Sequence, residues 1–159
     1  MCDEPHDNCE SHECECCKFG PEEMERREQK AMRQYGWFSH IVPEDPDSPL
    51  NFNAHTHGFG VTFDQPDVQI VLPLPQKVLG HVLHSLADKI RDEDYKMETG
   101  VPVEGILHGN YKVMFVKAVE CDRQVFRMIL PDKDGNLEQS EQQEGFADQW
   151  VGSGDYREN

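Results

Sequence analysis

The sequence predicts an α+β fold in which a mixed or antiparallel sheet carries one main amphipathic helix. Strand-like segments occur before and after a single long helical segment, rather than alternating with helices one by one. That order is typical of α+β proteins and not of doubly wound α/β proteins. Regular apolar runs extend from Tyr35 to Leu130, whereas both ends of the chain are polar. A stretch of about 100 residues is long enough to bury a core.

A first helix is predicted to precede the sheet and to begin at Pro21. Proline fits the first turn of a helix, where its missing N–H removes no hydrogen bond. Glu22 and Glu23 suit the positive end of the helix dipole, and Glu22 forms a favourable i,i+4 pair with Arg26. Gly36 is expected to end this helix.

Three strand-like segments are predicted between this helix and the main one. The first is residues 36–42, followed by a loop rich in proline and aspartate at residues 43–49. Residues 51–63 alternate roughly between apolar and polar, with two glycines that indicate a bulge or a close backbone approach. Residues 68–74 form a continuous apolar run, as expected for a central strand buried on both faces.

The main helix is predicted from residue 76 to about residue 92. Its apolar residues recur with the helical period and share one face. They are Val78, Leu79, Val82, Leu83, Leu86 and Ile90. Further strands are expected at residues 103–108, 111–119 and 124–130, the first two joined by a hairpin turn at Gly109 and Asn110.

Composition divides the chain into three parts. Residues 1–20 form an acidic tail rich in cysteine and histidine, with one aromatic residue and no aliphatic run. Such a segment cannot bury enough apolar surface to order itself. Residues 21–136 are predicted to form the α+β domain, and residues 137–159 a polar, acidic C-terminal tail.

The charge of the chain disfavours some classes of partner. The formal net charge is −16, from 31 acidic and 15 basic residues. Such a surface repels nucleic-acid phosphates and anionic membranes, so we expect neither partner; a metal ion or a basic protein partner would suit it. The N-terminal residues contain no secretory signal pattern, and no run approaches the roughly 20 apolar residues of a membrane span, so a cytoplasmic location is expected.

Five potential metal ligands lie close together in the N-terminal tail: Cys9, His12, Cys14, Cys16 and Cys17. Thiolates and imidazoles are the usual ligands of zinc, which takes four in a tetrahedron. The spacing is not that of a standard zinc finger, and adjacent Cys16 and Cys17 cannot easily bind one ion together, although a metal cluster or Cu(I) would tolerate them. Zinc binding is the leading hypothesis for the tail. Its alternatives are an acidic tail with incidental thiols and a redox role.

His55 and His57 form a second candidate site. Residues i and i+2 of a strand face the same side, so both imidazoles could reach one metal ion. No third ligand is identified by the sequence, although His40 on the preceding strand is a candidate. The alternative is that one imidazole is a hydrogen-bonded core residue and the other is exposed.

Three other patterns are interpreted as structural. His81 and His84 have the spacing of helical metal ligands, but they fall on the polar side of the main helix. Residues 132–136 resemble a calcium loop, but the glycine is misplaced and a β-turn is favoured. Cys121 has no histidine near it in sequence, which favours a structural or exposed thiol over a nucleophile. No phosphate-binding glycine loop or serine nucleophile motif is present.

Several segments, in one order and over about two thirds of the chain, carry a resemblance to a known family. They are YGWFSHIV (35–42), NAHTHGF (53–59), PDVQIVLPL (66–74), VLGHVLHSLADKI (78–90), EGILHGNYKVMFVKAV (104–119) and FRMILPDKDGN (126–136). Together they resemble a bacterial family called domain of unknown function 4262. The resemblance implies a bacterial or phage-like cytosolic protein, and it supplies no activity, cofactor or catalytic residue.

The chain departs from the pattern of that family in three places. Many members have Tyr-Thr-x-Gly-Leu where this chain has His-Thr-His-Gly-Phe at residues 55–59. They tend to have Gly-His-Pro-Glu where residues 64–67 are Asp-Gln-Pro-Asp, and a tryptophan-rich ending is replaced by residues 136–139. A site that the family shared in those segments would be altered here.

Three functions remain open from the sequence. The leading one is an accessory or binding domain whose N-terminal tail takes zinc or a similar metal. The second is a metal-dependent enzyme centred on His55 and His57. The third is an interaction module that uses its acidic surface to bind a basic protein. Whether the chain is an enzyme, and its oligomeric state, are left undecided by the sequence.

Overall fold

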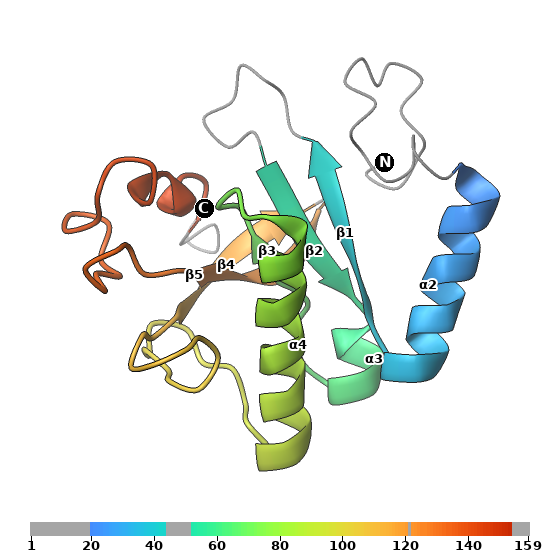
Figure 1. Ribbon diagram of the computed structural model, residues 1–159. Helices are drawn as coiled ribbons and strands as arrows, with labels where there is room; N and C mark the ends of the chain where they lie inside the picture. The colour runs from blue at the N-terminus through green and yellow to red at the C-terminus, as the bar shows by residue number, and fades with distance from the viewer. Residues whose placement is uncertain (1–19, 44–51, 121, 154–159) are drawn as a thin grey trace.

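The computed structural model describes residues 20–43, 52–120 and 122–153 of the chain (Figure 1). In chain order the elements are α2 (Pro21–Tyr35), β1 (Phe38–Pro43), β2 (Phe52–His57), α3 (Phe59–Phe63), β3 (Val68–Ile70), α4 (Gln76–Glu93), β4 (Met114–Glu120), β5 (Arg123–Ile129) and the 3₁₀ turn η1 (Ala147–Trp150). The predicted tail ligands Cys9, His12, Cys14, Cys16 and Cys17 lie outside the described residues.

The strands form one mixed sheet in the order β1-β2-β3-β5-β4. All neighbours are antiparallel except β3 and β5, which are parallel. Helix α4 packs across one face of this sheet, and α2 stands beside β1 at its edge (Figure 1). Five of the six residues predicted for the apolar stripe of α4 are buried against sheet residues such as Ala54, Ile70 and Phe115. The sixth, Val78 in the first turn, is exposed. The α+β class with a mixed sheet and one main packed helix is therefore confirmed.

Both helices predicted from the sequence are present at nearly the expected bounds. In α2 the chain leaves the helix at Gly36, whose φ of 82° is left-handed and whose N–H bonds to the carbonyl of Met32. None of the residues of α2 is fully buried, so the helix contacts the domain along a thin stripe only. By contrast, α4 buries six residues, because its apolar stripe is continuous over its whole length.

The second predicted strand is interrupted after six residues. Strand β2 ends at His57, and the chain then turns into the short helix α3. Gly58 makes this turn with a φ of 107°, and a Cβ atom there would lie 2.6 Å from the carbonyl oxygen of Gly36. The close backbone approach that the glycines indicated is therefore present at Gly58. It lies at the end of the strand, and no β-bulge forms there.

Two other strand predictions were wrong in extent. Residues 68–74 contain a strand of only three residues, because Pro73 and Pro75 interrupt the apolar run and cannot donate to a sheet. Residues 103–108 form no strand: Val103 and Val113 make an isolated bridge, and the segment between them is irregular. The hairpin of the second half is β4–β5, not a turn at Gly109.

Residues 137–153 include a segment that lies against the polar face of β5. The buried guanidinium of Arg127 donates to the carbonyl oxygens of Gln149, at 2.9 Å, and Val151. The side chain of Gln149, also buried, bonds to both backbone groups of Leu130. This polar segment can pack here because its buried groups form hydrogen bonds with polar groups of β5 and Leu130. The apolar pattern of the sequence gives no sign of such packing.

The turn after β5 is organised by the buried carboxylate of Asp132. Its oxygens accept backbone N–H bonds from Asp134, Asn136 and Gln143 at 2.9–3.0 Å. Burial alone would raise the pKa of Asp132, but these hydrogen bonds hold it below its ordinary value. The structure therefore makes residues 132–136 a turn, as predicted, with Gly135 bonding back to the Asp132 carbonyl at 3.0 Å.

We expect Asp132→Asn to lower the melting temperature by several degrees at neutral pH, since an amide NH₂ replaces an oxygen that accepts two hydrogen bonds. Because the pKa is depressed in the folded state, the ionised carboxylate stabilises the fold above its ordinary pKa. That stabilisation is lost as the pH falls through the folded-state pKa. Thermal melts followed by circular dichroism should show the difference between the two proteins shrinking as the pH falls below the ordinary pKa of an aspartate, which is about 3.9. A constant difference would contradict this account.

Candidate metal centre

A row of polar side chains crosses the sheet on the face turned away from α4. His40 on β1 pairs with His55 on β2, His55 pairs with Gln69 on β3, and Gln69 pairs with Arg127 on β5. Cross-strand partners lie on the same face, and the neighbours of these residues along each strand, such as Ala54, belong to the core against α4. Alternation along the strands therefore places the imidazoles of His40 and His55 side by side.

Three histidines converge at the β1 end of this row. The Nε2 atoms of His55 and His57 are 3.0 Å apart. Each of His40, His55 and His57 offers one ring nitrogen, and the three nitrogens lie within 4.8 Å of one another. His55 is buried, whereas His40 and His57 are half-buried at the edge of the site. His55 and His57 do face one side, and His40, which the sequence left as a candidate, supplies the third ring nitrogen of the cluster.

The spacing of the three nitrogens is close to that of a tetrahedral metal site. Zn–N bonds of about 2.0–2.1 Å at tetrahedral angles place two ligand nitrogens about 3.3 Å apart. The pair formed by His55 and His57, at 3.0 Å, needs to open by only a few tenths of an ångström. The nitrogens separated by up to 4.8 Å need to approach by at most about 1.5 Å.

His55 is held in the form that binds metals. Its burial, followed by the nearby His57, His40 and Arg123, lowers its pKa to about 3. The imidazole is therefore neutral at physiological pH and loses no proton when it coordinates an ion. At 3.0 Å the Nε2 atoms of His55 and His57 are within hydrogen-bonding distance, so one donates its proton to the other. A metal ion between them would take the place of that proton, which would move to the other nitrogen of its ring or to solvent.

A buried carboxylate lies behind His55. Glu120, at the end of β4, has an Oε1 atom 3.4 Å from Nδ1 of His55, and both side chains are almost completely buried. A carboxylate beside the other nitrogen of a ligating histidine orients the ring and raises its basicity. A proton on Nδ1, on the side of Glu120, would leave the lone pair of Nε2 directed at His57 and at the centre of the site.

Arg123 neutralises this carboxylate and ties three strands together. Its Nε donates to Glu120 at 3.1 Å, one terminal nitrogen to Asp67 at 2.8 Å, and the other to the carbonyl of Thr56 at 3.1 Å. Thr56 lies between the two histidines of β2 in the chain. The same guanidinium therefore holds the backbone that carries His55 and the carboxylate that faces it.

The outer side of the site is formed by α2 and β1. The carboxylate of Glu28 on α2 contacts Nε2 of His40 directly. The ring of Phe38 stacks on His57, with the ring centroids 5.0 Å apart and the planes 25° from parallel. Together these contacts limit the rotation of the two half-buried histidines.

The remaining sequence candidates lie elsewhere. His81 and His84 are exposed on α4, where His81 stacks on His108 and His84 packs against Trp37. In the described part of the chain, the only group of three or more such residues able to hold one ion is the histidine triad. Cys121 falls outside the described residues.

Sequence reasoning missed the residues that surround the triad. Glu28, Glu120 and Arg123 occur in segments with no motif, and only the topology of the sheet brings them to the histidines. For Glu120 one signal was available: it continues the alternation of β4 with Val116 and Ala118, so it shares their face. A carboxylate in that position would be expected to have a polar partner.

No helix within the described ranges is both long and apolar enough to cross a membrane. Neither a curated protein nor a solved structure matches the chain. A family model described as "Domain of unknown function (DUF4262)" matches residues 31–140, which include β1, β2 and all three histidines. This match spans more than half of the sequence, so the chain belongs to the DUF4262 family.

Proposed function

We propose that this domain binds one divalent transition-metal ion, zinc before others, through His40, His55 and His57. The observation that carries the proposal is the convergence of three ring nitrogens within 4.8 Å at the edge of the sheet. Imidazole nitrogens favour zinc, copper, iron and nickel over magnesium and calcium, which take oxygen ligands. The net charge of −16 also favours the approach of a cation.

The arrangement around the triad supports a metal site over a structural histidine cluster. Hydrophobic packing does not require three imidazoles together, and a buried one beside a carboxylate is the usual support of a metal ligand. Three protein ligands leave a fourth position for water or another molecule, as in catalytic zinc sites. An ion held there would act as a Lewis acid and would lower the pKa of bound water.

A metal-dependent enzyme is the second candidate function. The observation that favours it is the carboxylate of Glu28 in contact with His40, on the exposed side of the triad. A carboxylate beside the open position of a metal site can serve as a general base toward metal-bound water. Hydrolysis of ester and amide substrates that depends on added zinc, and is lost in Glu28→Gln while zinc is retained, would support this role.

The N-terminal ligands Cys9, His12, Cys14, Cys16 and Cys17 make a second proposed metal set. The test must therefore separate a site made of imidazoles from one that contains thiolates. Cobalt(II) does so, because a thiolate bound to cobalt gives an intense charge-transfer band in the near ultraviolet and an imidazole does not. A full-length variant with all tail cysteines changed to serine removes that band and leaves the triad intact.

We expect the serine variant to bind one equivalent of zinc, measured against a chromophoric chelator, and to give a cobalt spectrum without the thiolate band. In the unaltered chain, a further equivalent with the thiolate band would support metal binding by the tail as well. The proposal for the triad is overturned if the serine variant binds no zinc.

A further inference from the structure

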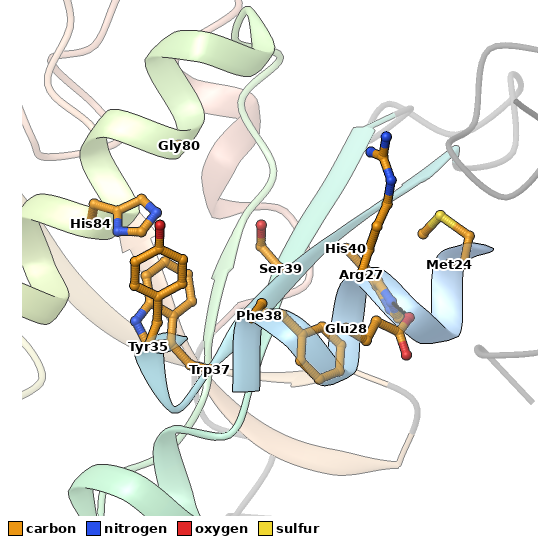
Figure 2. Close-up of a pocket in the computed structure, with 11 residues that line it drawn as sticks. Met24, Arg27, Glu28, Tyr35, Trp37, Phe38, Ser39, His40, Gly80 and His84 are labelled. Atoms are coloured by element: carbon orange, nitrogen blue, oxygen red, sulfur yellow. Dashed lines mark hydrogen bonds and ion pairs between the residues drawn. The ribbon is translucent and has the colours of Figure 1, made fainter. Parts of the chain in front are cut away.

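A cavity of about 240 Å³ lies between α2 and α4, alongside β1. Of the three histidines of the triad, His40 lines one end of this cavity, together with Glu28 (Figure 2). At roughly 30 Å³ for each water molecule in the liquid, it has room for about eight waters or a small organic molecule. The cavity therefore adjoins the proposed metal position and is large enough to hold part of a ligand.

The far end of the cavity is aromatic. Tyr35, Trp37 and His84 gather there, with ring centroids 4.9 Å apart for Tyr35 and His84 and 4.8 Å apart for Trp37 and His84 (Figure 2). Trp37 is only 3% exposed, and its indole Nε1 has no hydrogen-bond partner within the described part of the chain. A flat apolar group would find π-faces and edges to pack against at this end.

The near end of the cavity is charged. Arg27, Glu28 and His40 line it, and Figure 2 shows them on the opposite side of Ser39 from the aromatic group. An ion at the triad adds positive charge beside Arg27. An anionic oxygen donor is the group that both an imidazole-bound metal ion and a guanidinium attract.

We propose that the cavity binds a small aromatic molecule whose other end carries an acidic, oxygen-donating group that coordinates the metal. The inference rests on the proposed function, since the ion at His40, His55 and His57 holds the acidic end. The aromatic end lies among Tyr35, Trp37 and His84. Binding sites of this kind are typically apolar with a few polar groups that set the orientation of the ligand.

Gly80 makes the cavity testable without disturbing either end. It lies on α4 and lines the cavity, and a Cβ atom built on it meets no atom within 4 Å. A larger side chain at this position would enter the open space. Leucine also has a higher helix propensity than glycine, so Gly80→Leu should fold at least as well as the unaltered protein.

The probes are phenylacetohydroxamate and acetohydroxamate, which share a metal-chelating group and differ by one phenyl ring. Each is titrated by isothermal calorimetry into the zinc-loaded full-length variant whose tail cysteines are serine, so that the only proposed zinc site is the triad. We expect the phenyl compound to bind at least about tenfold more tightly, because its ring is removed from water. In Gly80→Leu this advantage should disappear while zinc affinity is unchanged. The control His81→Leu, on the exposed side of α4, should keep it.

Zinc affinity is measured first, so the two proposals fail separately. Absence of zinc binding overturns the metal centre and the ligand proposal together. If zinc binds but both hydroxamates bind equally well, the cavity is not a ligand site of this class. The same conclusion follows if the phenyl compound keeps its full advantage in Gly80→Leu, because the ring would then lie elsewhere.

Discussion

Replacing His57 by alanine is expected to weaken zinc binding about a thousandfold or more. Substitutions of residues that only support a metal ligand typically lower metal affinity by roughly 10–100-fold, so the expected effect is clearly larger. The substitution removes one of the three proposed ligand nitrogens. Only His40 and His55 would then hold the ion, and water would fill its other coordination positions. His40→Ala should have an effect of similar size. Competition with a chromophoric chelator, in the variant whose tail cysteines are serine, measures both affinities.

The two half-buried histidines are better targets than His55. His55 is buried to 99% of its surface, so its removal would leave a cavity in the core beside Glu120, and loss of zinc could then follow from unfolding. His57 and His40 reach the solvent, and circular dichroism should show their alanine variants folded.

His108→Ala is the matched control for these variants. This histidine is exposed and stacks on the ring of His81, away from the triad, so zinc affinity should not change. Wild-type affinity in both His40→Ala and His57→Ala would show that the triad does not hold the ion.

How far the sequence predicts this fold depends on how local each signal is. Helix α4 is encoded by a stripe of apolar residues at one period, and α2 by Pro21 at its start and Gly36 at its end. These signals need no knowledge of the rest of the chain. Strand β3 is different, because only three residues of its seven-residue apolar run form a strand. Its length is limited by the prolines that follow and by the few residues that pair with β2 and β5.

The same distinction applies to the candidate site. The period of two along β2 places His55 and His57 on one face, and this was visible in the sequence. The position of His40 depends on the register between β1 and β2, which the intervening segment does not reveal. Glu120 is 65 positions from His55 in the chain, and only the parallel pairing of β3 with β5 brings it there. No local pattern carries that information.

Arg123→Met is expected to have the largest effect on stability among substitutions around the site. It leaves the carboxylates of Glu120 and Asp67 without the guanidinium that bonds to both. Breaking a buried ion pair typically costs roughly 3–5 kcal/mol, and we expect about 3 kcal/mol because 32% of the Arg123 side chain is exposed. Urea unfolding of the metal-free proteins measures the difference.

Arg26→Met is the control, since Arg26 pairs with Glu23 at 2.7 Å on the surface of α2 with 73% of its side chain exposed. Exposed pairs contribute about 0–1 kcal/mol, so this variant should remain close to the unaltered protein. Equal losses in the two variants would mean that the network behind His55 has no special role in the fold.

Zinc should change the loss of stability caused by Arg123→Met, which would not be expected if Arg123 only supported the fold. Arg123 contributes a positive potential at His55, as its part in lowering the pKa of that residue shows. Removing the guanidinium leaves a more negative site, which attracts a cation more strongly. The zinc ion then supplies a positive charge near Glu120 in place of the guanidinium that was removed. We therefore expect saturating zinc to restore more stability to Arg123→Met than it adds to the unaltered protein, and an equal gain in both would contradict a metal ion bound in front of Glu120.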